Sequence, residues 1–114
     1  MKKKIFCFDI DGVICKTQNG KYKNSKPIKK NINFINKLYD EGNYIKLFTS
    51  RYMGRFNEDV KKAKKVGFKF TEKQMLNWKI KYHKLILGKP SYDYFIDDKA
   101  FNSIKDFFSK KKWI

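Results

Sequence analysis

Short apolar runs bounded by acidic residues or glycine recur along the chain, and each predicts a buried strand. The predicted strands cover residues 4–8, 44–48, 85–87 and 92–96. Apolar residues at helical spacing lie between or after these runs and predict helices. The predicted helices cover residues 27–41, 58–66, 72–79 and 101–108. Strands that alternate with helices favour an α/β layer fold with a parallel or mostly parallel central sheet.

The polar stretch after the first strand carries a turn signal. Asn19-Gly20 lies within residues 13–26, and this dipeptide favours the central positions of a type I′ hairpin turn. A small flap hairpin is therefore expected directly after the first strand. Pro27 suits the first position of the helix that follows, and Gly42 suits its end.

Capping signals divide the lysine-rich region into two predicted helices. Asn57 can cap the first of them and Gly67 can end it. Thr71 and Gln74 resemble a capping box, which predicts a second, shorter helix. The last predicted helix should turn its aromatic side chains toward the core, where Trp113 is also expected.

One connection is hard to reconcile with a parallel sheet. Only Gly88–Ser91 separate the last two predicted strands. A parallel crossover between neighbouring strands needs about a dozen residues or more. Either these two strands are not adjacent, or one of them runs antiparallel.

The length of 114 residues, 41% of them apolar, suits a single domain over residues 1–114. No apolar stretch approaches the ~20 residues of a membrane span, so a cytoplasmic protein without a membrane partner is expected. Cys7 and Cys15 lack the spacing of a zinc site or a disulfide scaffold, and both are expected to be reduced.

The formal net charge of +17 would ordinarily indicate nucleic acid or an anionic surface as a partner. Of the 28 basic residues only Arg51 and Arg55 are arginines, and the 26 lysines are spread along the chain. The lysine excess is therefore interpreted as a solvated face, with nucleic acid as the less favoured partner. The 11 acidic residues are more informative, because four of them form two pairs that each follow an apolar run.

Polar residues stand directly after three of the predicted strands. They are Asp9 and Asp11, Thr49 and Ser50, and Asp97 and Asp98. The carboxyl ends of strands converge in an open α/β sheet, and ligands collect there. Four carboxylates in one crevice repel each other unless a cation neutralises them, and a few oxygen ligands with open positions favour Mg²⁺. The simpler interpretation of each pair is a turn or a helix cap.

The stretch Ile5-Phe6-Cys7-Phe8-Asp9-Ile10-Asp11-Gly12-Val13 resembles motif I of the haloacid dehalogenase superfamily of phosphotransferases. Thr49 resembles motif II, Lys89 resembles motif III, and Phe95-Ile96-Asp97-Asp98 resembles motif IV, in the family's order. The resemblance implies a three-layer, Rossmann-like core, here without a cap domain. A receiver domain uses similar residues, but it would carry its acidic pair after the first strand and its phosphorylated aspartate after a central strand. Here Asp9-Ile10-Asp11-Gly12 comes first and the double acid Asp97-Asp98 comes last, which disfavours a receiver domain.

The resemblance also implies a role for each residue. Asp9 would be the nucleophile that forms an aspartyl phosphate, and Asp11 would protonate the leaving oxygen and then activate water. Thr49 and Ser50 would bind the phosphoryl group, and Lys89 would neutralise it. The ligands of Mg²⁺ would be Asp9, the backbone carbonyl of Asp11, and Asp97 or Asp98.

Two basic assignments stay open. Lys84, at the other end of the predicted strand 85–87, would replace Lys89 if that strand ran antiparallel. Lys89 is preferred because its surroundings resemble those of a lysine in the 5′(3′)-deoxyribonucleotidases. Arg51 and Arg55 would lie on one helical face near Thr49, where they could bind a second phosphate or a carboxylate of the substrate, or simply lie on the surface.

Residues 78–100 are similar to small bacterial phosphatases of capsular polysaccharide biosynthesis, which implies a phosphorylated sugar as substrate. The likeness to deoxyribonucleotidases implies a nucleotide as the alternative. The family's capless members act on bulky substrates or borrow a cover from a neighbouring subunit, so a large substrate or a homo-oligomer is expected. A different class is a non-catalytic nucleic-acid-binding module, and a polynucleotide-end phosphatase would combine both functions.

Overall fold

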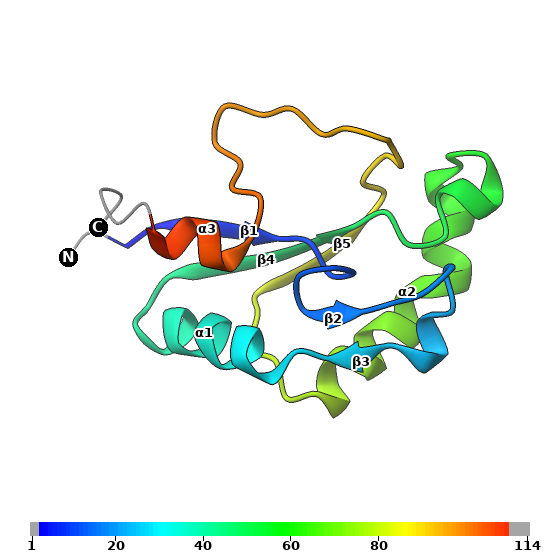
Figure 1. Cartoon of the computed structure of the whole chain (residues 1–114). Helices are drawn as coiled ribbons and strands as arrows, with labels where there is room; N and C mark the ends of the chain where they lie inside the picture. Colours follow the sequence, from blue (N-terminus) through cyan, green and yellow to red (C-terminus); the bar gives the residue numbers. More distant parts are fainter. Residues whose placement is uncertain (1–2, 110–114) are drawn as a thin grey trace.

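The computed structural model describes residues 3–109, and its centre is a parallel three-stranded sheet (Figure 1). The strands, in spatial order, are β1 (Ile5–Phe8), β4 (Tyr44–Thr49) and β5 (Lys84–Leu87). Ile5 pairs with Tyr44 and Thr49 pairs with Leu87, so all three strands run in one direction and their carboxyl ends meet at one edge. The α/β fold with a parallel sheet is confirmed. Trp113 lies outside the described residues.

Both crossover helices cover the same face of this sheet. They are α1 (Lys29–Asp40), which precedes β4, and α2 (Val60–Asn77), which joins β4 to β5. Two right-handed crossovers that step the same way across a sheet leave their helices on one face. Ile35 of α1, Leu47 of β4 and Met75 of α2 accordingly belong to one buried cluster. Cys7 is exposed on the other face, so residues 3–109 form two layers rather than the expected three.

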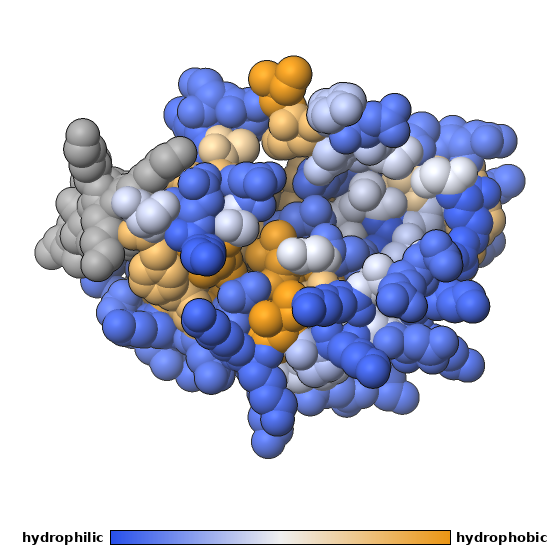
Figure 2. Space-filling model, viewed as in Figure 1, coloured by the Kyte–Doolittle hydropathy of each residue, from blue (hydrophilic) through white to orange (hydrophobic). Residues whose placement is uncertain are grey.

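The last predicted strand, over residues 92–96, is wrong. The chain is irregular and exposed there, between β5 and α3 (Ile104–Ser109). Tyr94 is 88% exposed and Ile96 is 94% exposed. This segment arches over the sheet in Figure 1, and hydrophobic atoms stand out at its crest in Figure 2. After β5 ends at a sheet edge, four residues cannot carry the chain back for parallel pairing with β5.

The helix α3 packs through aromatic side chains, as its pattern predicts. Phe107 meets Phe6 of β1 edge to face, with ring centroids 5.7 Å apart. Phe108 lies against Phe34 of α1, with centroids 4.5 Å apart, and Ile104 is buried in the main core. In the described part of the chain, none of the helices is long and apolar enough to cross a membrane.

The predicted flap is present after β1. It is an antiparallel pair of very short strands, β2 (Cys15–Lys16) and β3 (Lys26–Pro27). Asn19 and Gly20 both have positive φ angles, 52° and 67°, which is the geometry of a type I′ turn. Pro27 belongs to β3, so it does not begin the helix as expected. The helix α1 begins two residues later because Pro27 is still paired with Cys15.

One continuous helix, α2, replaces the two predicted ones. Its N-cap is Asp59, whose Oδ1 accepts a hydrogen bond from the Lys62 amide at 3.1 Å, whereas Asn57 adopts a left-handed conformation before it. The helix runs through Gly67 and Thr71, and both are buried. The expected stop at Gly67 and the expected cap at Thr71 are therefore wrong, since tertiary contacts account for both residues.

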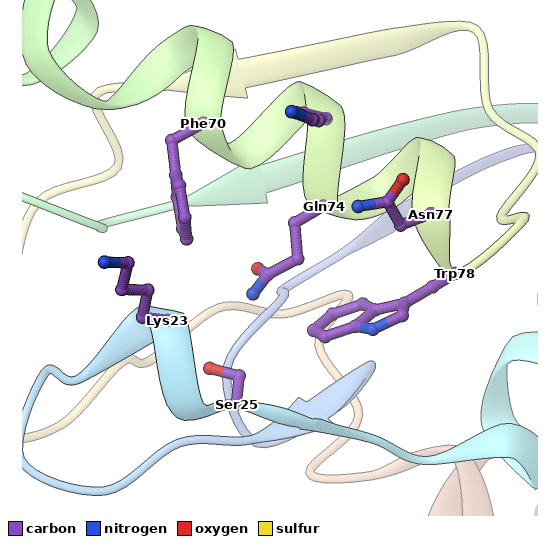
Figure 3. Close-up of a pocket in the computed structure, with 7 residues that line it drawn as sticks. Lys23, Ser25, Phe70, Gln74, Asn77 and Trp78 are labelled. Atoms are coloured by element: carbon purple, nitrogen blue, oxygen red, sulfur yellow. The ribbon is translucent and has the colours of Figure 1, made fainter.

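The flap packs against α2. The single-turn helix η1 (Tyr22–Asn24) follows the flap's turn, and the Gln74 side-chain amide donates to the Tyr22 carbonyl at 2.8 Å. Figure 3 shows Gln74 between Phe70 and Trp78 on the face of α2 that looks toward Ser25. The flap is thus held to the helix by a direct hydrogen bond.

Gly67 makes room for Tyr52, which precedes α2. A β-carbon on residue 67 would lie 2.2 Å from two ring carbons of Tyr52, and Tyr52 is itself buried with a φ of 69°. The change Gly67→Ala is expected to lower the free energy of unfolding by about 1–3 kcal/mol, although alanine is the better helix former. Urea denaturation measures this loss.

Gly54→Ala is the matched control for that prediction. A β-carbon on residue 54 would meet its nearest neighbour, Oγ of Ser91, at 3.9 Å, which is an ordinary contact. This variant should keep its stability within about 0.5 kcal/mol. Equal losses in the two variants would contradict the steric explanation.

Candidate functional site

Three polar residues meet where the sheet ends. Asp9 follows β1, Thr49 is the last residue of β4, and Lys89 follows β5. The Lys89 ammonium lies 3.4 Å from Oδ2 of Asp9, and the Lys89 amide donates to the Thr49 carbonyl at 3.2 Å. Because β5 runs parallel to β4, Lys84 lies at its opposite end, beside Lys46. The geometry therefore selects Lys89 over Lys84 as the lysine that reaches Asp9.

The Lys89 side chain is held in a nearly closed environment. Only 7% of this residue is exposed, and its ammonium lies 4.8 Å from the ring centre of Phe95 and 5.2 Å from that of Tyr92. Burial alone would lower the pKa of Lys89, but a hydrogen bond with Tyr92 and the charge of Asp9 outweigh it, so the pKa is raised. Lys89 thus stays cationic beside the carboxylate.

Asp9 is partly buried and oriented by its own backbone. Its Oδ1 accepts a hydrogen bond from the Ile10 amide at 2.8 Å. Burial raises the pKa of Asp9, and the opposing effect of Lys89 does not cancel the shift. A carboxylate that loses hydration in this way is a stronger nucleophile than one in free solution.

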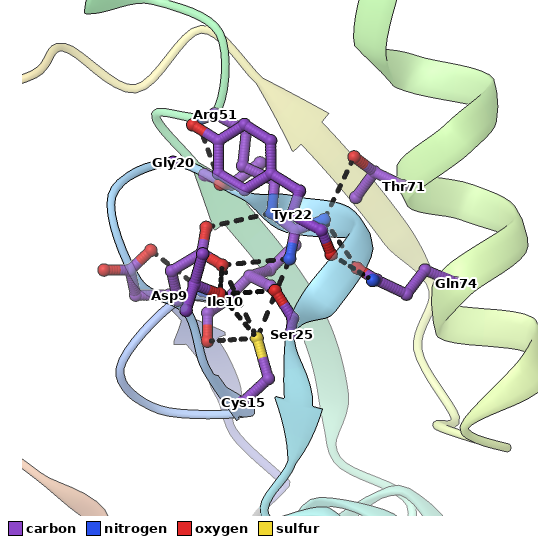
Figure 4. A network of polar contacts seen from close by, with 12 residues as sticks. Asp9, Ile10, Cys15, Gly20, Tyr22, Ser25, Arg51, Thr71 and Gln74 are labelled. Carbon is purple, nitrogen blue, oxygen red and sulfur yellow. Dashed lines mark hydrogen bonds and ion pairs between the residues drawn. The ribbon is translucent and has the colours of Figure 1, made fainter.

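Asp11 forms a two-pronged ion pair with Arg51, whose other neighbours Tyr22 and Gln74 are labelled in Figure 4. Nε of Arg51 lies 2.9 Å from Oδ2 of Asp11, and Nη2 lies 2.9 Å from Oδ1. The Thr17 hydroxyl of the flap also donates to Oδ1 of Asp11. This geometry fixes the plane of the carboxylate as well as its position.

Arg51 is buried and faces away from solvent. Its Nη1 donates to Oε1 of Gln74 at 2.6 Å, and its guanidinium stacks 4.6 Å above the centre of the Tyr22 ring. Burial alone would lower the pKa of Arg51, but the hydrogen bonds to Asp11 and the negative charge of Asp11 outweigh that effect, so the pKa of Arg51 is raised. The sequence left open whether Arg51 binds the substrate or lies on the surface; instead it is buried and holds Asp11 from within the protein.

Arg55 is the second arginine and holds the flap. Its Nη2 donates to the Gly20 carbonyl at the turn, at 3.1 Å, and its guanidinium stacks on Tyr52 at 4.9 Å from the ring centre.

Ser50 and Thr49 both take part in the turn after β4. Ser50 is half-buried, and its carbonyl accepts a hydrogen bond from the Met53 amide. The Thr49 hydroxyl accepts a hydrogen bond from the Arg51 amide at 3.1 Å.

Asp97 and Asp98 do not join this cluster. Both are exposed in the irregular segment before α3, where Oδ1 of Asp97 accepts the Lys99 amide at 3.1 Å. Within residues 3–109 no group of three or more acidic, histidine or cysteine side chains lies close enough to hold a metal ion. Asp9 and Asp11 are instead each paired with a basic side chain of the protein.

Sequence patterns missed the residues that contact Asp11 or Arg51. They are Thr17, Tyr22, Thr71 and Gln74, drawn from the flap and from α2. Thr71 and Gln74 looked like a capping box because a helix start and an arginine site use the same polar residues. The lone histidine, His83, is structural: its Nδ1 accepts the Ile45 amide at 3.0 Å.

We define the strand-end cluster as Asp9, Asp11, Thr49, Arg51 and Lys89.

Comparison with known proteins adds information about the fold. No family model matches the chain, and no curated protein does. A crystal structure of a structural-genomics target from Vibrio cholerae is similar, with a TM-score of 0.79 and 24% identity over 88% of this chain and 83% of that one. At this level of identity, the likeness shows a shared fold alone.

Proposed function

We propose that this protein is a phosphomonoester hydrolase of the haloacid dehalogenase type, working through an aspartyl phosphate on Asp9. The observation that carries the proposal is the contact between Lys89 and Asp9, which brings the ends of β5 and β1 together. A partly desolvated carboxylate beside a buried ammonium suits attack on a phosphoryl group, whose oxygens need a nearby positive charge. Thr49 ends the strand between them.

The proposed reaction has two steps. One carboxylate oxygen of Asp9 attacks phosphorus, the bond from phosphorus to the leaving oxygen breaks, and protonated Asp11 supplies that oxygen with a proton. Water then attacks the aspartyl phosphate, Asp11 takes its proton, and the phosphorus–Asp9 bond breaks. Because both oxygens of Asp11 accept hydrogen bonds from Arg51, each of these proton transfers requires one of those hydrogen bonds to open when the ester binds. Lys89 offsets the charge on the phosphoryl oxygens.

The described arrangement does not by itself fit a divalent cation. The two carboxylates of the strand-end cluster have protein cations as partners, and the two other candidate ligands, Asp97 and Asp98, lie in the exposed segment. No step is therefore derived through Mg²⁺. The family resemblance still implies that Mg²⁺ is needed, so its requirement is tested directly.

Magnesium dependence should reveal whether the exposed acids approach Asp9. We expect phosphate release to require Mg²⁺, and at least one of Asp97→Asn and Asp98→Asn to raise the Mg²⁺ concentration for half-maximal rate by about tenfold or more. Asp93→Asn, in the same exposed segment, is the matched control and should change it by less than about twofold. Full activity without Mg²⁺, or unchanged titrations in both variants, would reject a metal role for these residues.

A phosphorylated sugar is the proposed first substrate class and a nucleotide the second, on the resemblances of the sequence. A phosphate-release screen of sugar phosphates, nucleotides and phosphorylated oligonucleotides distinguishes them. Release from none of these esters, together with salt-sensitive binding to DNA or RNA, would favour the non-catalytic binding module instead.

Two lysines at opposite ends of β5 provide a paired test of the site. Lys89→Met is expected to lower the rate of phosphate release by about a hundredfold, because it removes the charge beside Asp9. Lys84→Met removes the same charge far from Asp9 and should change the rate by less than about twofold. Both rates are measured on the best ester from the screen. A Lys89→Met enzyme with the native rate would overturn the proposed site.

A further inference from the structure

A groove lies between the flap and α2 (Figure 3), and neither Asp9 nor Lys89 lines it. Its volume is about 350 Å³, which is within the range of small-ligand sites. Two aromatic side chains, Phe70 and Trp78, stand on one face of α2 with Gln74 between them. Lys73 of α2 and Lys23 of η1 also line the groove.

The chemistry of this lining favours one kind of ligand. Among the described residues that line the groove none is acidic, and both ionisable ones are lysines, which suits a phosphate. Half-buried aromatic rings offer faces on which a flat ring can stack. The side-chain amide of Asn77 carries a paired donor and acceptor of the kind that binds the edge of a nucleobase, whereas the amide of Gln74 is already hydrogen-bonded to Tyr22 and Arg51.

The groove also reaches the strand-end cluster through two short routes. Gln74 lines the groove and accepts a hydrogen bond from Arg51, which holds Asp11. Ser25 lines the groove too, and its hydroxyl is hydrogen-bonded to that of Thr17, which donates to Asp11. Each route places a single side chain between the groove and the carboxylate. A ligand that draws on Gln74 or Ser25 must therefore change how Asp11 is held.

We propose that this groove binds a nucleoside phosphate, free or at the end of a single strand of nucleic acid, and that binding there changes the ion pair between Arg51 and Asp11. The base stacks on Phe70 or Trp78, and the phosphate lies by Lys23 and Lys73. Binding itself does not depend on the proposed function, whereas any effect of the changed ion pair on catalysis rests on the proposed function.

Tryptophan fluorescence tests the binding. The double variant Asp9→Asn/Trp113→Phe removes the proposed nucleophile and leaves Trp78 as the only tryptophan. Adenosine monophosphate, a 5′-phosphorylated trinucleotide, ribose 5-phosphate and inorganic phosphate are titrated separately. At least one of the two base-containing probes should quench Trp78 with a Kd at least tenfold below those of the other two. Quenching by the trinucleotide alone assigns the site to strand ends.

Lysine variants separate this site from general attraction to a basic protein. In the same background, Lys73→Met should raise the Kd of the base-containing probe about tenfold, and Lys64→Met, on α2 outside the groove, by less than twofold. The proposal is overturned by an unresponsive Trp78, by equal affinity for ribose 5-phosphate, or by equal effects of the two lysine variants.

The coupling has its own readout, independent of activity. Arg51 and Arg55 are the only arginines, so their Nε–H groups give two signals in a ¹⁵N correlation spectrum, and Arg55→Lys assigns them. A saturating base-containing probe should shift the Arg51 signal in the Asp9→Asn protein. An unmoved signal would disprove the coupling, whatever the outcome for phosphate release.

Discussion

Replacing Asp9 with asparagine is expected to lower phosphate release by about a thousandfold or more, because the amide cannot form the aspartyl phosphate. The rate is measured on the best ester from the screen, beside the native protein. Since burial raises the pKa of Asp9, the native rate should fall on acidification at a higher pH than an ordinary aspartate would give. Native activity in Asp9→Asn would assign the nucleophile elsewhere.

The same substitution should leave the fold intact. A raised pKa means that the folded state binds the Asp9 proton more tightly than the unfolded state, so this group's contribution to stability falls as pH rises from the ordinary aspartate pKa through the raised one. Asparagine carries no charge to desolvate. Urea denaturation at neutral pH should therefore show no loss of stability, which separates lost chemistry from lost structure.

Replacing Arg51 with methionine is expected to lower the free energy of unfolding by about 3–5 kcal/mol, the usual result of breaking a buried ion pair. Arg51 is fully buried, and its loss leaves Asp11, Gln74 and Thr71 without their shared partner. It also removes the stacking on Tyr22 that ties the flap to the sheet. Urea denaturation measures the loss.

Arg55→Met is the matched control for Arg51→Met. Arg55 is exposed and donates one hydrogen bond to the flap, so its loss should cost no more than about 1 kcal/mol. Similar losses in both variants would contradict the structural role given to the Arg51–Asp11 pair. Any catalytic change in Arg51→Met is interpreted only under conditions where that variant is folded.

The sheet and the flap could be predicted because local sequence determines them. The run before Asp9 and the run before Thr49 are mostly apolar and short, and each ends at a polar residue, so both strands follow from pattern alone. Asn19-Gly20 adopts the left-handed pair of conformations that few other dipeptides accept.

Tertiary contacts account for the parts that could not be predicted. Glycine ends helices in many proteins, but at position 67 of this chain the absence of a side chain makes room for the ring of Tyr52. Residues 92–96 have a strand's composition, but the four residues that follow β5 are too few for a parallel crossover back to that edge strand. Arg51 was expected to bind the substrate or to lie on the surface, because a sequence cannot show that Asp11, forty positions away, turns toward it.

The aromatic contact between Phe6 and Phe107 has a consequence for biogenesis. It joins the first strand to the last described helix, and Ile104 of that helix completes the main core. While the chain is still being made on the ribosome, β1 can pair with β4 but cannot yet pack against α3. The core is therefore completed only after the helix has emerged from the ribosome. A nascent chain stalled before residue 104 should be cleaved by proteases far more readily than the finished protein.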